Sequence, residues 1–266
     1  MRTLLTALLI GGTILTIGGI LCSRYGLTSM FTGLVATGSG LLFITLVAVL
    51  SIITMLMLFK IQGGLLVFLL LGCSPLIVGF VVMGPGSFKL PLIHDITTDT
   101  AEPPEFEFAR IGRQRQDNSL NYPGKEVAAQ QLNAYPDIVP HVVDTAPLQL
   151  LPAVEGVAES LGWKLLGSDE LMLRVEAQDR STLFGFIDDV VVRLSPLSTG
   201  SRVDVRSVSR LGRGDFGANA ARIRDFYRAL CNTPGISCKA LQDIENPDGK
   251  GGSLSQKSVD SISSDS

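Results

Sequence analysis

The chain has 266 residues, of which 46% are hydrophobic and 18% are charged, with a formal net charge of -3. All acidic residues lie beyond position 94, so an almost uncharged apolar part precedes a water-soluble part that is acidic by about seven charges. This balance excludes nucleic acid as an expected partner, because binding to phosphate backbones needs clustered Lys and Arg.

Three apolar runs, 3–21, 31–59 and 64–83, are each long enough to cross a bilayer, which takes about 20 residues. They predict a transmembrane region over 1–86. The first run is longer than the apolar core of a signal peptide, and another apolar run follows it closely. We therefore expect it to be retained as an anchor.

The second run exceeds the length needed for one crossing, which predicts a tilted helix or one that extends into the interface. It contains Gly33 and Gly40, with Ala36 between them. This spacing of small residues suits a close helix contact, although lipid-facing positions without a packing role would look the same.

Three crossings place the two termini on opposite sides of the membrane. Arg2 and Lys60 on one side balance Arg24 and Lys89 on the other, so only the terminal amine decides the orientation by the positive-inside rule. We expect a multi-pass protein of the bacterial inner (plasma) membrane, with a cytoplasmic N-terminus and a C-terminal domain that is periplasmic or otherwise extracytoplasmic.

The four cysteines fall into two pairs of different surroundings. Cys231 and Cys238 flank a turn at 232–235, which favours a disulfide in an oxidising compartment, while two ordinary small side chains are the plainer interpretation. Cys22 and Cys73 lie in apolar sequence and are expected to be inert.

The water-soluble part begins with an extended, proline-rich lead-in over 87–146, where Pro103 and Pro104 forbid a helix. An α+β domain is expected over 147–242, with an antiparallel sheet of about four strands packed by two helices. A tail over 243–266, rich in Gly, Ser and Asp, is predicted to be disordered.

The elements of the predicted domain follow from apolar spacing. Three-and-four spacing predicts a helix at each end of the domain, and alternation between turn signals predicts the strands. The predicted helices are 147–161 and 218–230, and the predicted strands are 163–166, 171–178, 187–194 and 202–209.

The Gly-x-Gly-x-x-Gly pattern at Gly212, Gly214 and Gly217 follows a strand and precedes a helix, as a dinucleotide fingerprint does. However, only one helix and a tail come after it, so no βαβ unit is available. Asp215 inside the loop would repel a phosphate and is expected to cap the helix instead.

Along the fourth predicted strand and the residue after it, Arg202, Asp204, Arg206 and Arg210 share one face. The neighbouring strand 187–194 offers carboxylates for cross-strand pairing, so we favour a structural charge network over an anion site. The candidate ligand-binding residues are Asp189, Arg193, Asp204, Arg206, Arg210, Arg213, Asp215 and Asn219.

Signals for catalysis are weak. His94 and His141 both lie in the lead-in, away from a nucleophile motif, and their acidic neighbours are too few for a metal site. Asp188 and Asp189 are adjacent on a strand and point to opposite faces. We predict no catalytic residue, no metal ligand and no cofactor.

Five segments together resemble one bacterial family, domain of unknown function 1499, over about residues 88–230. They are IHDITTDTAEPPEF, YPDIVP, LGWKLL, FGFIDDVVVRL and RVDVRSVSRLGRGDFGANAARIRDF. The resemblance implies a bacterial or plastid protein without a securely assigned activity. It also implies a shared surface lined by Asp189, Arg206, Arg210, Arg213 and Asn219.

The leading hypothesis is therefore an exported domain that binds a small anionic ligand, a lipid head group or another envelope protein. The expected partners are membrane lipid and an envelope protein, and not nucleic acid. One alternative is an envelope hydrolase that uses Asp204 or Asp215 with Arg206 and Arg210. The other is a purely structural module.

Overall fold

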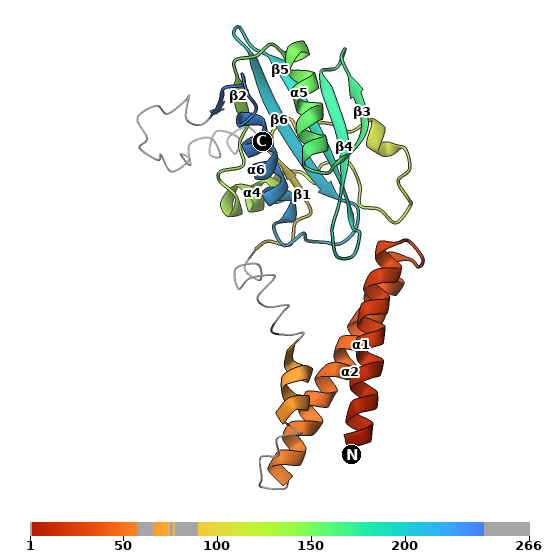
Figure 1. Ribbon diagram of the computed structural model, residues 1–266. Coiled ribbons are helices and arrows are strands. Elements are labelled where there is room, and N and C mark those ends of the chain that lie inside the picture. The colour runs from red at the N-terminus through yellow and green to blue at the C-terminus, as the bar shows by residue number, and fades with distance from the viewer. Residues whose placement is uncertain (1, 58–65, 75–76, 78–89, 242–266) are drawn as a thin grey trace, which may run out of the picture.

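The computed structural model describes residues 2–57, 66–74, 77 and 90–241 (Figure 1). Residues 66–74 are helical. The rest of the third predicted span, 64–83, lies almost wholly outside the described residues, as does the predicted tail. Of the three predicted crossings, the described part of the chain therefore supports two.

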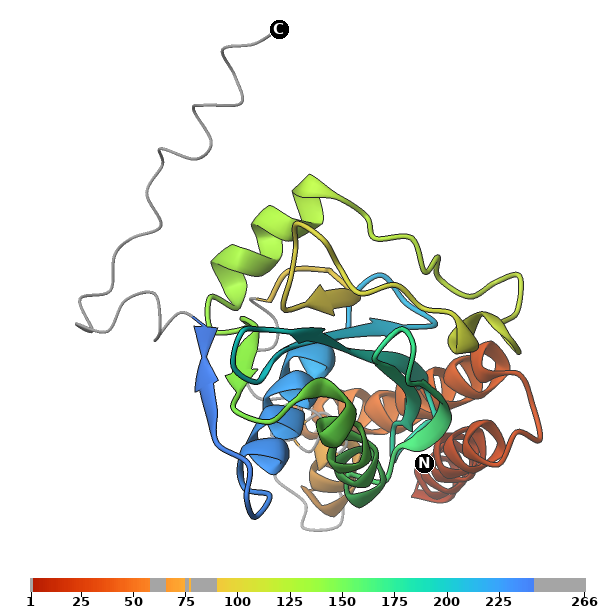
Figure 2. The same cartoon turned by 90° about the horizontal axis from the view of Figure 1, so that it is seen from above.

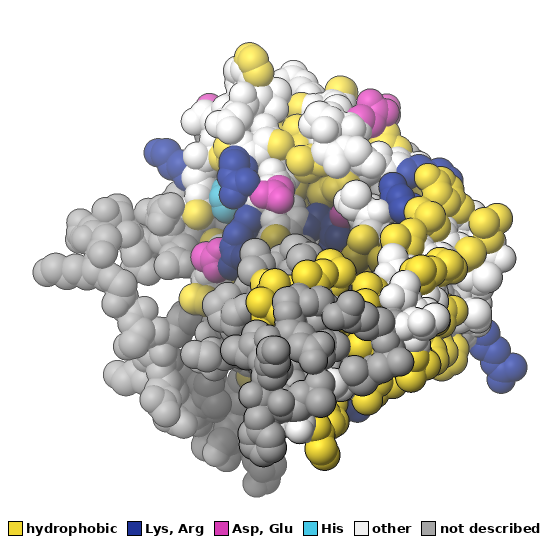
Figure 3. Space-filling view, turned by 60° about the horizontal axis from the view of Figure 1, so that its bottom comes forward, with side chains coloured by type: hydrophobic (Ala, Val, Ile, Leu, Met, Phe, Trp, Pro, Cys, Tyr) yellow, Lys and Arg dark blue, Asp and Glu magenta, His cyan; other side chains and the backbone are white. Residues whose placement is uncertain are grey.

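Helices α1 (Arg2–Arg24) and α2 (Met30–Met57) form an antiparallel hairpin (Figure 1). Among the described residues, these two are long and apolar enough to cross a membrane. Only 17% and 33% of their most apolar windows are buried, whereas the core helix of a water-soluble protein would be mostly covered. Hydrophobic side chains accordingly lie along the exposed helices (Figure 3), which is compatible with membrane anchoring.

The helices approach each other through glycines. A Cβ atom added at Gly33 would lie 2.5 Å from the Cβ of Ser23 and 2.8 Å from the carbonyl oxygen of Gly19. One added at Gly40 would lie 2.5 Å from the carbonyl oxygen of Gly12. The glycines of α2 therefore lie on the surface that contacts α1. Only glycine allows the two backbones to come this close.

The described residues contain a seven-stranded, entirely antiparallel sheet in the order β3-β4-β5-β6-β2-β7, with β1 also paired to β6. The strands are β1 (Asp95–Thr97), β2 (His141–Val143), β3 (Lys164–Asp169), β4 (Arg174–Arg180), β5 (Ile187–Pro196), β6 (Ser201–Ser209) and β7 (Cys238–Ala240). The α+β class is confirmed, but the predicted number of four strands is wrong. The four predicted strands are β3 to β6, and the three additional ones have three residues each, too few for an alternating pattern.

Two helices, α5 (Pro147–Ser160) and α6 (Ala218–Cys231), cover one face of the sheet (Figure 2). The main core lies between them and the sheet, and Trp163 stacks on Phe226 there with ring centroids 5.8 Å apart. The opposite face is covered by the segment that follows β1, where Phe106 packs on Val208. The sheet is thus buried on both sides.

The lead-in over 87–146 contributes more regular structure than its prolines predict. Besides β1 and β2 it contains a 3-10 helix, η2 (Phe108–Arg110), and helix α4 (Lys125–Ala134). The prolines restrict only their own neighbourhood, and the sequence KEVAAQQLNA beyond them is rich in helix formers. Gln131 of α4 accepts a hydrogen bond from the Thr97 amide and donates one to the Thr97 carbonyl, so the helix is fixed against β1.

Candidate functional site

Arg206 lies at the middle of β6 and points away from the two core helices. Its guanidinium donates to both carboxylate oxygens of Asp95, at 2.9 and 2.7 Å, and to the carbonyls of Pro104 and Leu120. The ring of Phe106 lies 5.2 Å from the guanidinium carbon, and Arg206 is only 2% exposed. These four hydrogen bonds all go to residues of the lead-in, so Arg206 holds the lead-in on the sheet.

A second cluster on the same face surrounds Asp204. Arg193 donates to Asp204 and Asp99, each at 3.1 Å, and Arg202 donates to the same two carboxylates at 3.0 and 2.7 Å. Two arginines and two aspartates therefore neutralise each other. The predicted cross-strand pairing between Arg193 and Asp204 is present, and Asp99 comes from the lead-in.

A third cluster surrounds Asp189, which is fully buried. Arg210 donates to its two oxygens at 3.0 and 2.9 Å, and Arg113 from the lead-in contacts it as well. Burial lowers the pKa of Arg113, and the charge of Asp189 opposes this effect. One carboxylate here serves two guanidinium groups, with Asp117 3.7 Å from Arg210 as the next nearest.

The helix-covered face carries a separate polar cluster. Asn219 donates to the His94 carbonyl at 3.0 Å and accepts from the Ser207 hydroxyl at 2.7 Å. Arg222, which the sequence analysis did not select, pairs with Asp188 at 2.6 Å. Asn219 and Arg206 are therefore separated by the sheet, and the residues implied by the family resemblance do not line one surface.

Asp215 accepts hydrogen bonds from the amides of Gly217 and Asn219, each at 2.8 Å. It thus caps α6, as the sequence predicts, and takes the amides that a bound phosphate would need. Burial raises the pKa of Asp215, opposed by these two backbone donors.

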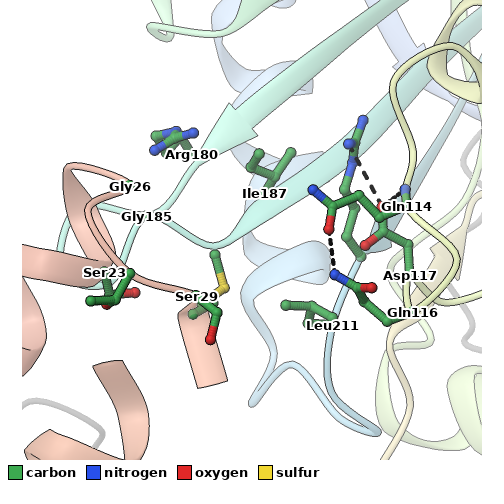
Figure 4. A pocket seen from close by; sticks show the side chains of 13 residues that line it. Ser23, Gly26, Ser29, Gln114, Gln116, Asp117, Arg180, Gly185, Ile187 and Leu211 are labelled. Carbon is green, nitrogen blue, oxygen red and sulfur yellow. Dashed lines mark hydrogen bonds and ion pairs between the residues drawn. The ribbon is translucent and has the colours of Figure 1, made fainter. Parts of the chain in front are cut away.

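A cavity of about 310 Å³ lies where the α1–α2 loop meets the domain (Figure 4). We call it the junction pocket. The hairpin side is formed by Ser23, Gly26, Thr28, Ser29 and Met30, and the domain side by Gln114, Gln116, Asp117, Arg180, Gly185, Ile187, Arg210 and Leu211. Of the residues proposed from sequence, only Arg210 lines it.

Direct hydrogen bonds join the two sides of the junction pocket. The Ser23 hydroxyl donates to the Phe184 carbonyl at 3.0 Å. Arg24 donates to the Ser181 carbonyl at 3.0 Å, and Arg180 donates to the Arg24 carbonyl at 3.2 Å. The end of α1 is therefore attached to the loop between β4 and β5.

The junction pocket has a positive electrostatic environment. Neither Arg180 nor Arg24 has a carboxylate within 4.0 Å among the described residues, whereas Arg113 and Arg210 are balanced by Asp189 and Asp117. Helix α2 also begins here, with its Thr32 amide donating to the Ser29 hydroxyl at 3.1 Å. The positive end of the helix dipole adds to the unpaired guanidinium charge.

The predicted disulfide is present between Cys231 and Cys238, whose Cα atoms are 5.4 Å apart. It joins the end of α6 to β7. Cys22 and Cys73 are free thiols. Within the described ranges, no group of three or more His, Cys, Asp or Glu side chains is placed to hold a metal ion.

Most of the sheet domain matches the model of a known protein family. The family model described as "Protein of unknown function (DUF1499)" matches residues 95–230, from β1 almost to the end of α6 and just over half of the chain. A search of curated proteins found no match. The match agrees with the resemblance seen in the sequence, and the chain belongs to the DUF1499 family of proteins of unknown function.

Proposed function

We propose that this protein is a membrane-anchored lipid-binding protein whose junction pocket binds the phosphate of an anionic lipid head group. The observation that carries the proposal is Arg180, an exposed guanidinium without an ion pair among the described residues, on the wall of a cavity shared with the membrane hairpin. An arginine without an ion pair is free to bind a phosphate oxygen through charge-assisted hydrogen bonds.

The level of the junction pocket supports a lipid as the source of the phosphate. Helix α1 has 23 residues, which at about 1.5 Å per residue matches a hydrocarbon core of about 30 Å. Its last residue, Arg24, and the Ser29 cap of α2 would then lie at the depth of the head groups. A phosphate there meets Arg180 and the N-terminus of α2 together.

Asp117 also lines the junction pocket and limits the negative charge that it accepts. A phosphodiester, with one negative charge, meets less repulsion from this carboxylate than a phosphomonoester, which carries up to two. The primary amides of Gln114 and Gln116 offer neutral donors for head-group hydroxyls. We therefore propose a phosphodiester lipid such as phosphatidylglycerol.

The experiment uses the full chain in detergent, with bound lipid counted by native mass spectrometry. Arg180→Gln is expected to reduce phosphatidylglycerol occupancy by about tenfold, since a charge-assisted hydrogen bond contributes about 1.5 to 3 kcal/mol. Arg228→Gln is the matched control, because Arg228 is exposed on α6 outside the junction pocket. Equal occupancy in the wild type and Arg180→Gln contradicts the proposal.

Two further arms identify the source of the phosphate. Phosphatidylcholine, which has a phosphodiester but no net charge, is expected to bind more weakly than phosphatidylglycerol. Inorganic phosphate is expected not to compete at millimolar concentration. Displacement of the lipid by inorganic phosphate would assign the junction pocket to free anions instead.

We also propose that the domain lies outside the cytoplasm of a bacterium, at the inner membrane. The disulfide supports this orientation, because disulfides persist in oxidising compartments. Blocking free thiols in intact cells before lysis and reduction tests it. Cys231 and Cys238 are expected to become labelled only after reduction, and labelling without reduction contradicts the orientation.

A structural role is supported for Arg202 and Arg206 of β6 and for Arg210 directly after it, because each pairs with a buried aspartate. The hydrolase alternative has less support. Asp204 is held by two arginines and Asp215 by two backbone amides, so each carboxylate already has partners.

A further inference from the structure

The loop between β4 and β5, residues 181–186, lies against the last turn of α1. The Ser23 hydroxyl bonds the Phe184 carbonyl, and a Cβ atom at Gly185 would lie 3.4 Å from the Cα of Arg24. Leu183 at the tip of this loop is 57% exposed. An apolar side chain is thus exposed to solvent at the level where α1 ends.

The loop between β6 and α6, residues 211–217, leaves the same end of the sheet. The register pairs Asp188 at the start of β5 with Ser209 at the end of β6, and both Gly185 and Leu211 line the junction pocket. The two loops are therefore neighbours, as the lower end of the sheet in Figure 1 shows.

Phe216 in this second loop has a strained backbone and an open ring. Its φ is 54°, in the left-handed region that bulky residues avoid, and its side chain is 54% exposed. The bonds from the Gly217 and Asn219 amides to Asp215 hold this conformation. An aromatic ring is therefore exposed beside the start of α6.

Basic and apolar neighbours accompany Phe216. Leu92 packs on Gly214 and is 70% exposed. Arg213 is exposed and has no ion pair among the described residues. This surface combines exposed Phe and Leu with Arg and lies next to the end of an apolar helix. Such a composition is typical of surfaces at the membrane interface.

We propose that the loops 181–186 and 211–217 insert Leu183 and Phe216 into the same bilayer that holds α1 and α2. The domain then contacts the membrane directly, with Arg213 at the depth of the head groups. The occupant of this surface is the bilayer because the first loop is bonded to the end of α1. The inference rests on membrane anchoring and does not depend on lipid binding in the junction pocket.

The single tryptophan of the chain makes this testable by fluorescence. Trp163 is 6% exposed and packed in the core, so it supplies a constant background. The full chain is reconstituted in phosphatidylglycerol vesicles with brominated acyl chains, which quench only nearby indoles. Leu183→Trp and Phe216→Trp are compared with Leu171→Trp, which lies in the β3–β4 turn at the opposite end of β4 and is 94% exposed.

The emission added by Leu183→Trp and by Phe216→Trp is expected to be quenched by bromolipid and protected from iodide. The emission added by Leu171→Trp is expected to be quenched by iodide and not by bromolipid. The emission of the wild type is expected to change with neither quencher. Quenching of either loop variant no greater than that of Leu171→Trp overturns insertion of that loop. Vesicles of phosphatidylcholine with brominated acyl chains are expected to quench the two loop variants as well, which separates loop insertion from binding of an anionic head group.

Discussion

The helical hairpin and the sheet domain achieve close packing by opposite means. In the hairpin, α1 and α2 meet through Gly33 and Gly40, and the contact contains no ion pair among the described residues. In the domain, fully buried carboxylates such as Asp189 and Asp204 are surrounded by guanidinium groups. Shape complementarity without charge suits a lipid solvent, whereas a domain folded in water tolerates buried charge where each charge lies beside an opposite one.

Removing one partner of the most deeply buried pair gives the largest expected effect on the domain. Asp95→Ala leaves the Arg206 guanidinium buried without its counter-charge, which is expected to cost about 3 to 5 kcal/mol of unfolding free energy. Chemical denaturation of the full chain in detergent, followed by Trp163 fluorescence, measures it.

Asp137→Ala is the control, because Asp137 pairs with Arg224 on the surface and its side chain is 53% exposed. Its expected cost is below about 1 kcal/mol. A loss for Asp95→Ala as small as that of Asp137→Ala contradicts the role assigned to Arg206. Joint replacement by Asp95→Leu and Arg206→Met is expected to recover most of the stability.

The α1–α2 contact is expected to be disrupted by a larger side chain, and not by the loss of a charge. Gly33→Val places a Cβ within 3 Å of α1, which is expected to cost about 1 to 3 kcal/mol and to separate the helices. Gly38→Val on the same helix is the matched control, because a Cβ added at Gly38 meets no atom of another segment within 4 Å. Cross-linking of cysteines introduced on α1 and α2 measures the separation. Equal cross-linking in both variants would show that the glycine contact is dispensable.

The smallest expected effect concerns a single charge at the start of α6. The pKa of Asp215 is raised in the folded state, mainly by burial, so the fold favours its neutral form. Stability from this group is therefore fully present below its unfolded pKa of about 3.9 and falls as the pH rises through the higher folded value. Asp215→Asn is expected to flatten this fall above about pH 4. Unchanged pH dependence in denaturation curves would remove Asp215 as its cause.

The predictability of the fold follows element length. Apolar alternation in β5 and β6 and helical spacing in α5 and α6 gave correct elements, because each is nine residues or longer. Strands of three residues carry no period, and their positions depend on partners distant in sequence. Helix α4 was missed because the nearby prolines dominated the interpretation of the lead-in.

The site shows the same limit. The sequence indicated that β6 carries a structural arginine network, but it proposed partners on β5 alone. Asp95, Asp99 and Arg113 complete the network from a segment about a hundred residues earlier, which no local pattern reveals. The excess of aspartates in the lead-in was an available signal, since buried arginines need carboxylates. Arg180 gave no such signal because its importance comes from the position of the hairpin.

The amide of Gln131 has one more consequence. Strand β1 is bonded to β6 on one side, and on the other side Gln131 occupies both the N–H and the C=O of Thr97. A side chain thereby replaces the next strand. This border of the sheet is thus closed at Thr97 to pairing with a foreign strand, which protects the domain from edge-to-edge aggregation.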